Sequence, residues 1–299
     1  MKIVVIGAGG QLGTDCCRLF AGEHHTVGCD FPAIDIASPA SVNSFLEQEQ
    51  PEVIINCAAY TAVDGCESQA ALAWQVNAEG PGHLARTAER LGCRIIHIST
   101  DYVFDGTRPA GEAYRENDRP NPLSEYGRSK LAGEQAVIAH ATDYLILRTA
   151  WLYSAWGGNF LKTILRLALA DPERELKVVN DQFGSLTWSL TLARQIRPLL
   201  HSDLKGIAHA TAEGYSTWYE GARAFLDEMA VPYRMRPCTT AEYPTPAHRP
   251  ANSILENRVL KGAGLALFVD WREDLTSFVR EHRAHLLAEN QKGYPAALL

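Results

Sequence analysis

The chain has 299 residues, 46% of them hydrophobic, and carries a formal net charge of −7. Its basic residues are scattered, so no face neutralises phosphates and nucleic-acid binding is not expected. No apolar run reaches the about 18 residues of a membrane helix, and the start lacks the features of a signal peptide. Its seven cysteines lack metal-ligand spacing and several lie in apolar segments. We therefore expect free thiols and a cytoplasmic protein.

The first half of the chain alternates short β-rich apolar runs with helical patterns. Strands are predicted at residues 3–6, 26–30, 53–56, 95–99 and 144–147, and helices at 11–21, 39–50, 68–91 and 123–139. This alternation indicates βαβ units and a parallel sheet that is buried on both faces. Right-handed crossovers then give a doubly wound Rossmann sheet in an α/β protein.

After Trp151 the pattern changes. A helix is predicted at 159–170, a short strand at 177–179 and a helix at 191–200, and the chain from 206 onward is richer in proline. We expect residues 1–150 to form the sheet domain, with a return segment at about 175–205. Residues 151–174 and 206–299 would form a smaller α/β domain over the carboxyl edge of the sheet.

The first turn between a strand and a helix is rich in glycine, reading Gly7-Ala8-Gly9-Gly10-Gln11-Leu12-Gly13. Gly7 permits a tight turn, Gly10 lets the backbone approach a pyrophosphate, and Gly13 lets helix and strand pack closely. The phosphates would meet the positive end of the helix dipole. The spacing is looser than in the usual fingerprint, so a turn without chemical significance is the alternative. We assign this turn, with Gln11 and Leu12, to a dinucleotide.

An acidic residue, Asp30, ends the second strand, where a carboxylate would bind the adenosine ribose hydroxyls. No arginine follows to neutralise a 2′-phosphate, which favours NADH over NADPH; a carboxylate that merely caps the strand is the alternative. Other residues assigned to the cofactor follow the second and third strands: Asp35, Ile36, Ala58, Ala59, Tyr60 and Thr61. Tyr126 and Lys130, further along the chain, are assigned to the cofactor as well.

The segment from Tyr126 to Lys130 carries the first sign of catalysis. Residues four apart share one face of a helix, so the ammonium of Lys130 would lie beside the phenol of Tyr126. A neighbouring cation would lower the pKa of the tyrosine and make it a usable proton donor and acceptor. The pair occurs in ordinary exposed helices too, so it needs support from elsewhere in the chain.

That support comes from Ser99-Thr100-Asp101-Tyr102, which follows a predicted strand at the ligand-binding edge of the sheet. A hydroxyl there can hydrogen-bond a carbonyl that is being reduced while Tyr126 supplies the proton. Together with the glycine turn, these residues would converge on one nicotinamide. We assign Thr100, Asp101, Tyr126 and Lys130 to catalysis.

With these segments the chain resembles the extended short-chain dehydrogenase/reductase superfamily and, within it, the dTDP-4-dehydrorhamnose reductase family. The similar segments span nearly the whole chain: 10–13, 59–64, 99–106, 126–134, 148–151, 158–160, 181–184 and 245–250. The resemblance implies hydride transfer from NADH or NADPH to C4 of a dTDP-4-keto-6-deoxy-L-hexose, giving dTDP-L-rhamnose.

The resemblance also implies roles for single residues. Thr100 and Tyr126 would bind the C4 oxygen, and Lys130 would hold the nicotinamide ribose. Trp151 would pack against the sugar, although a core tryptophan is an equal alternative. Asn159 and Arg249 would serve the nucleotide-diphosphate end. The residues assigned to the nucleotide-sugar substrate are Thr100, Asp101, Tyr102, Tyr126, Trp151, Asn159 and Arg249.

Departures from the family concern a loop and a metal. Leu186 stands where the family usually has proline. Some relatives dimerise around Mg²⁺ held by carboxylates, and Asp15 matches one of these, but residues 187–189 offer no acid. Hard cations need several oxygen ligands, so we assign no metal ligand. For the oligomeric state, the sequence is compatible with a monomer and with a homodimer.

Two rival functions remain. Dehydratases of the superfamily carry an acid after their Thr-Asp pair, where this chain has Tyr102, but a sugar-nucleotide epimerase is excluded less firmly. The second rival is a non-catalytic subunit similar to the regulatory β subunit of methionine adenosyltransferase. The segments at 148–151 and 181–184 look more like those of the enzymes.

Overall fold

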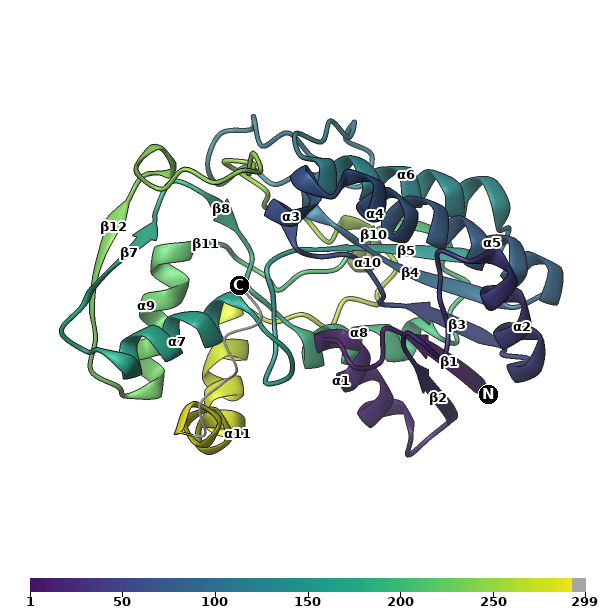
Figure 1. The fold of residues 1–299 in the computed structure, drawn as a ribbon, viewed down its shortest axis with the longest axis horizontal. Helices are drawn as coiled ribbons and strands as arrows, with labels where there is room; N and C mark the ends of the chain where they lie inside the picture. Colours follow the sequence, from purple (N-terminus) through teal and green to yellow (C-terminus); the bar gives the residue numbers. More distant parts are fainter. Residues whose placement is uncertain (292–299) are drawn as a thin grey trace.

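The computed structural model describes residues 1–291 and contains a six-stranded parallel sheet with strand order β10-β5-β4-β3-β1-β2 (Figure 1). The strands are β1 Lys2–Ile6, β2 His25–Cys29, β3 Val53–Asn56, β4 Arg94–Thr100, β5 Tyr144–Thr149 and β10 Gly206–His209. The order reverses between β1 and β3. In open parallel sheets, ligands bind at such a point, outside the carboxyl ends of the strands. The predicted doubly wound sheet is confirmed.

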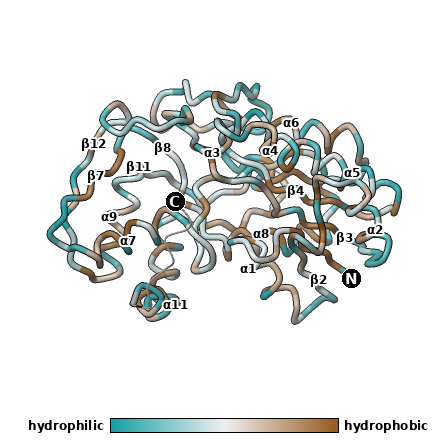
Figure 2. The backbone as a smooth tube through the Cα atoms, viewed as in Figure 1, coloured by the Kyte–Doolittle hydropathy of each residue, from teal (hydrophilic) through white to brown (hydrophobic). Residues whose placement is uncertain are grey.

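Alternate residues of each strand enter two separate cores, as a sheet covered on both faces requires. In β1, Ile3 and Val5 pack with α1 and α8, whereas Val4 and Ile6 pack with α2 and α5. The helices on the first face are α1 Gln11–Phe20 and α8 Ser189–Leu199; those on the second are α2 Pro39–Glu49, α5 Gly80–Leu91 and α6 Glu125–His140. Figure 2 shows that hydrophobic residues concentrate along the strands between these layers.

The single helix predicted at 68–91 is divided in the structure. Its elements are α3 Val63–Ser68, α4 Ala70–Trp74, a π-helical turn at Gln75–Glu79, and α5. The π turn carries the buried Asn77, whose side chain accepts from the Tyr60 N–H (2.8 Å) and donates to the Tyr60 carbonyl (3.1 Å). Through these two hydrogen bonds, Asn77 of the π turn fixes the loop after β3.

A second body of the chain, which we call the smaller lobe, packs around a core that includes Trp188, Phe225 and Phe278. Its helices are α7 Phe160–Ala170, α9 Trp218–Met229 and α11 Trp271–Gln291 (Figure 1). Its strands form three pairs: β6 Leu152–Tyr153 with β9 Thr187–Trp188, β8 Phe183–Gly184 with β11 Ser216–Thr217, and β7 Glu175–Val179 with β12 Arg234–Cys238. The chain also contains two short helical turns. Asp101–Val103 directly follows β4 of the sheet, and Thr240–Glu242 follows β12 of the smaller lobe.

The arrangement differs from the expected domain boundaries in two places. The strand β7 belongs to the smaller lobe because it pairs with β12, so only α8 of the segment 175–205 lies on the sheet. The strand β10 pairs with β5 and completes the sheet, and α10 Arg258–Gly262 packs Leu260 into the core below it. Residues 292–299 of the predicted smaller domain lie outside the described residues.

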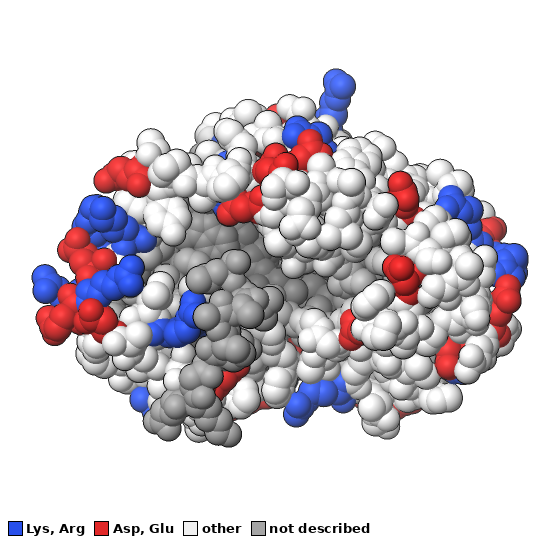
Figure 3. All heavy atoms as spheres, viewed as in Figure 1, with Lys and Arg blue, Asp and Glu red and all other residues white. Residues whose placement is uncertain are grey.

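The surface at the far end of the smaller lobe carries both signs of charge, over β7 and β12 (Figure 3). These charges pair with one another, as Arg236 does with Glu175 at 3.0 Å. Across residues 1–291, no helix combines the length and hydrophobicity needed to cross a bilayer.

Candidate active site

A cavity of about 1420 Å³ lies between the sheet and the smaller lobe. One wall is formed by the glycine turn, the carboxyl ends of β2, β3 and β4, and the start of α6. The opposite wall is formed by residues of β6, α7 and β7. The cavity therefore opens at the edge of the sheet where the strand order predicts a ligand.

The glycine turn forms a cradle that side chains would fill. Gly7 has φ +82°, and a Cβ there would lie 2.7 Å from the Ala58 nitrogen. A Cβ on Gly13 would overlap the Gly7 carbonyl oxygen. Helix α1 begins after Gly10 without a side-chain cap, so its first N–H groups face the cavity as donors for phosphate oxygens. This backbone fits a dinucleotide pyrophosphate.

Asp30, Asp35 and Ile36 line the same end of the cavity. The Asp30 carboxylate accepts a hydrogen bond from the Gly9 N–H (2.6 Å), and the neighbouring Phe31 is 78% exposed. The cations that line the cavity in the described chain come from other segments: Lys130, Arg174, Lys177 and Arg249. None of these four cations belongs to the segment that follows Asp30 in the sequence.

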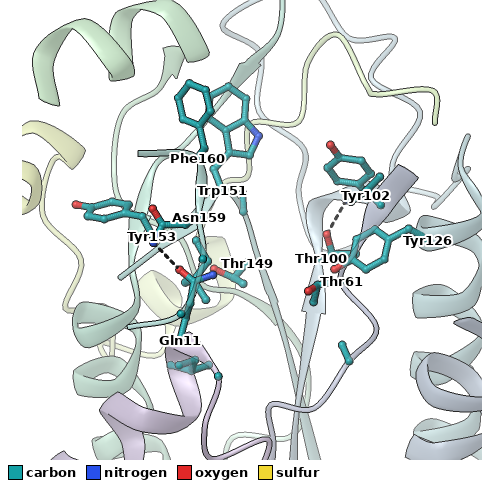
Figure 4. Close-up of a pocket in the computed structure, with 18 of the residues that line it drawn as sticks. Gln11, Thr61, Thr100, Tyr102, Tyr126, Thr149, Trp151, Tyr153, Asn159 and Phe160 are labelled. Atoms are coloured by element: carbon teal, nitrogen blue, oxygen red, sulfur yellow. Dashed lines mark hydrogen bonds between the residues drawn. The ribbon is translucent and has the colours of Figure 1, made fainter. Parts of the chain in front are cut away.

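Of the four predicted catalytic residues, Thr100 and Tyr126 lie close together (Figure 4), and Asp101 lines the same part of the cavity. The phenol of Tyr126 points toward the hydroxyl of Thr100, and the two groups interact (Figure 4). Thr100 also donates to the Asp101 carboxylate (3.0 Å) and accepts from the Tyr102 N–H (3.2 Å). The ring of Tyr102 stands edge-on to that of Tyr126, with centroids 5.6 Å apart. The end of β4 and the first turn of α6 thus present two hydroxyls to the cavity.

The protonation of this group differs from the expectation. Burial raises the pKa of Tyr126 well above its usual value, and the neighbouring hydroxyl of Thr100 only partly opposes this. The prediction that a neighbouring lysine lowers the pKa of Tyr126 was wrong for the protein in this state, because desolvation dominates. Burial also raises the pKa of Asp101 to about 6. Tyr126 is therefore a neutral phenol and a proton donor at neutral pH.

Lys130 lies one turn after Tyr126 and is almost fully buried. Its ammonium donates to the carbonyl of Ile98 (2.7 Å), which fixes it below the strand end that carries Thr100. Burial lowers the pKa of Lys130 to about 8, while Glu134 and Cys57 oppose the change. Lys130 therefore remains mostly charged at neutral pH and titrates above it.

On the opposite wall, Trp151 and Phe160 lie across the cavity from Thr100 and Tyr102 (Figure 4). Trp151 has the unusual φ of +47° and stacks on Trp218, with ring centroids 3.6 Å apart. Gly184 leaves room for the indole, since a Cβ there would lie 2.7 Å from its nitrogen. A strained backbone held by packing is typical of functional positions.

Asn159 and Arg249 line the cavity, but their donors are engaged within the chain. Asn159 caps α7 by accepting from the Lys162 N–H (3.1 Å) and donates to the Gln11 side chain (3.3 Å), a contact drawn in Figure 4. Arg249 forms two parallel bonds with Asp64, at 3.0 and 2.9 Å, and acts electrostatically on the phenol of Tyr102. Both residues therefore hold the cavity walls together.

The candidate metal ligand Asp15 is buried and accepts from three side chains of the smaller lobe and α8: Trp156 (2.9 Å), Ser154 (3.4 Å) and Ser189. Among the described residues, no three His, Cys, Asp or Glu side chains gather in a group that could hold a metal ion. Leu186, where the family has proline, is buried in the core of the smaller lobe.

Sequence reasoning missed Trp218, Asn77 and Asp64. Trp218 lies at the start of α9 and forms the surface on which Trp151 stacks. Asp64 is bound to an arginine 185 positions away in sequence. No local pattern reveals such pairings, because each partner reads as an ordinary residue of its own segment.

Comparisons with known proteins agree along almost the full length. Curated dTDP-4-dehydrorhamnose reductase from Burkholderia thailandensis is 39% identical, over 94% of this chain and 99% of that protein. The solved reductase of that name from Clostridium acetobutylicum superposes with a TM-score of 0.91 at 40% identity, again over 94% and 99% of the two chains. The one from Bacillus anthracis, in complex with NADP, has a TM-score of 0.90 at 36% identity and the same coverage. The model of the RmlD substrate binding domain family matches residues 1–284, and the chain belongs to this family.

Proposed function

We propose that this protein reduces the C4 keto group of dTDP-4-dehydro-L-rhamnose to give dTDP-L-rhamnose, with NADH or NADPH as the reductant. The observation that carries the proposal is the pair of hydroxyls on Thr100 and Tyr126, which lie side by side at the end of β4. The glycine cradle opens into the same cavity. The relatives described above are named for this reaction.

The cofactor would lie along the carboxyl edge of the sheet. The N–H groups at the start of α1 would hold its pyrophosphate, and Asp30 would hold the adenosine ribose. Lys130 would bind the nicotinamide ribose. The bound reduced nicotinamide supplies a hydride to the carbonyl carbon.

The hydroxyl of Tyr126 would donate to the ketone oxygen. Thr100 would donate to the same oxygen by turning its one hydroxyl hydrogen away from Asp101, its partner in the free protein. As C4 becomes tetrahedral, Tyr126 gives its proton to that oxygen, and the ammonium of Lys130 stabilises the phenolate that remains. The buried phenol keeps its proton until this moment because its pKa is raised. Tyr126 therefore acts as the general acid and Lys130 as its electrostatic support.

The smaller lobe would bind the sugar nucleotide. Trp151 offers a flat apolar surface to the C–H groups of the sugar, supported from below by Trp218. Asn159 and Arg249 would act at the diphosphate end by fixing Gln11 and Tyr102. Asp101 would orient Thr100 through their 3.0 Å hydrogen bond.

We further propose that NADH is the preferred cofactor. The Asp30 carboxylate lies against Gly9, and among the described residues the cations lining the cavity come from other segments. A 2′-phosphate would meet this carboxylate without a compensating charge. We also propose that the protein acts in the cytoplasm, where its proposed cofactor and sugar nucleotide would be available.

The test is to follow nicotinamide absorbance with purified protein, dTDP-4-dehydro-L-rhamnose and each cofactor in turn. Consumption of one cofactor per keto sugar supports the reductase. Retention of NAD⁺ through gel filtration, with no consumption of added cofactor, would favour the epimerase instead. Failure to oxidise either cofactor with any dTDP-keto sugar would contradict the proposal and favour a non-catalytic subunit.

A further inference from the structure

A buried carboxylate, Glu134, lies one helical turn after Lys130 on α6 and is 1% exposed. Arg148 binds both of its oxygens, through Nε to Oε1 (2.8 Å) and Nη2 to Oε2 (2.6 Å). The hydroxyl of Ser99 donates to Oε1 as well (2.5 Å). Burying an ion pair has a large desolvation cost, so such a pair is weak evidence for a contribution to stability alone. Its place in the fold suggests another role.

The partners of Glu134 come from the two strands that end at the reaction centre. Ser99 directly precedes Thr100 in β4, and Arg148 is its registered neighbour in β5. Glu134 therefore ties α6 to both strands through Arg148 and the residue that precedes Thr100.

One face of α6 contacts β4 at three successive turns. Tyr126, Lys130 and Glu134 are spaced at four-residue intervals, which places them along one side of the helix. Tyr126 meets Thr100, Lys130 meets the Ile98 carbonyl, and Glu134 meets Ser99. Glu134 is thus the anchor at the far end of the row that carries the proton donor.

The charges around Lys130 make Glu134 its main electrostatic support. The groups that act on the ammonium are Glu134 on α6, Cys57 after β3 and the buried His97 on β4. Burial keeps His97 neutral by lowering its pKa well below the usual value. Glu134 is the carboxylate among these groups, paired with Arg148, and it favours the charged form of Lys130.

We propose that Glu134 is a positioning residue that fixes α6 to the strand end bearing Thr100 and, by its charge, stabilises the ammonium of Lys130 on the same face of the helix. The proposal rests on the proposed function, because it concerns the same reaction centre. It adds a residue that does not itself touch the substrate.

The test is Glu134→Gln, which keeps hydrogen-bonding capacity and removes the charge. Without the anion, Lys130 loses its proton at lower pH. The alkaline fall in kcat/KM, and in the affinity for NADH or NADPH measured by nicotinamide fluorescence, should move down by about one pH unit. Ser99→Ala keeps all charges, so it should lower kcat at every pH and leave the position of the alkaline fall unchanged.

Glu89→Gln is the matched control, since it removes one exposed carboxylate from the neighbouring helix α5 and should leave both profiles unchanged. If Glu134→Gln does not fold, Glu134→Gln with Arg148→Gln avoids an unpaired buried charge and should shift the profiles in the same direction. If cofactor affinity falls at the same alkaline pH in either variant as in the wild type, the inference is overturned. Wild-type protein that binds cofactor without reducing the sugar contradicts the proposed function instead, and the binding profile still tests Glu134.

Discussion

At the scale of single residues, the site depends on a phenol that burial keeps protonated. Tyr126 is the proton donor of the proposed reaction, and the hydroxyl of Thr100 lies beside it. Tyr126→Phe keeps the ring and its contact with Tyr102 but removes the proton. Turnover should fall by about a hundredfold or more, the scale of general acid catalysis, with cofactor affinity nearly unchanged. Steady-state rates and fluorescence titration check this, and unchanged turnover would remove Tyr126 from the mechanism.

The pH dependence of the reaction should follow Lys130. Its pKa is lowered to about 8, so the ammonium is present below that pH and is lost above it. We expect kcat/KM to be level near neutral pH and to fall as the pH rises through about 8. Because the pKa of Tyr126 is raised, its ionisation comes later. In Lys130→Met, kcat/KM should be lower and should no longer fall as the pH rises through about 8. A fall that persists in this variant would belong to another group.

Cofactor preference is a further property of one side chain. Asp30 is exposed at the ribose end of the cavity, and its carboxylate accepts a hydrogen bond from the Gly9 N–H. In Asp30→Asn the repulsion of a 2′-phosphate disappears, so the ratio of kcat/KM for NADH over NADPH should fall by about tenfold, or 1.4 kcal/mol. A preference for NADPH in the wild type, unaltered by the substitution, would contradict the proposed role.

At the scale of elements, the ion pair of Asp64 and Arg249 joins α3 to the loop after the Thr240–Glu242 turn. Asp64 binds Arg249 through two bonds and also accepts from the Ala247 N–H (3.0 Å). Asp64→Asn should loosen this loop and free Arg249 from its position beside Tyr102. We expect the KM for the sugar nucleotide to rise several-fold while the cofactor Kd stays the same. A rise in both constants would point to a wider disturbance of the fold.

The elements that could be predicted from sequence are those whose signal is local. The strands β1 and β3 are short apolar runs between helical patterns, and they are buried on both faces of the sheet. The π turn carrying Asn77 has no such signal, because it depends on contacts with Tyr60 and α6. The edge strand β10 is defined by its pairing with β5 and was placed in the wrong domain. Helix α9 did carry a local signal, the capping box of Thr217 and Glu220, which was overlooked.

The same distinction holds for the site. The glycine turn, Thr100 and the Tyr126–Lys130 pair could be assigned because chemistry and spacing occur within one segment each. Their convergence at the sheet edge follows from the order of parallel strands. The pairing of Trp151 with Trp218, and the engagement of Arg249 by Asp64, join distant segments and required the structure.

At the scale of the whole molecule, two lobes enclose the cavity and are linked beside the cofactor cradle. Asp15 of α1 accepts from Trp156 and Ser154 of the smaller lobe, and Asn159 reaches Gln11. Each link joins the first helix after the glycine turn to the wall that would bind the sugar. The relative position of cofactor and substrate therefore depends on α1.

The central claim is that a hydride passes from the cofactor to C4 of a dTDP-linked keto sugar within this cavity. The most direct measurement uses cofactor carrying deuterium at the transferable position of the nicotinamide, with the product examined by NMR and mass spectrometry. We predict dTDP-L-rhamnose with deuterium at C4, in proportion to the cofactor oxidised. A product that carries no deuterium at C4, or the absence of product with both labelled cofactors, would contradict the account.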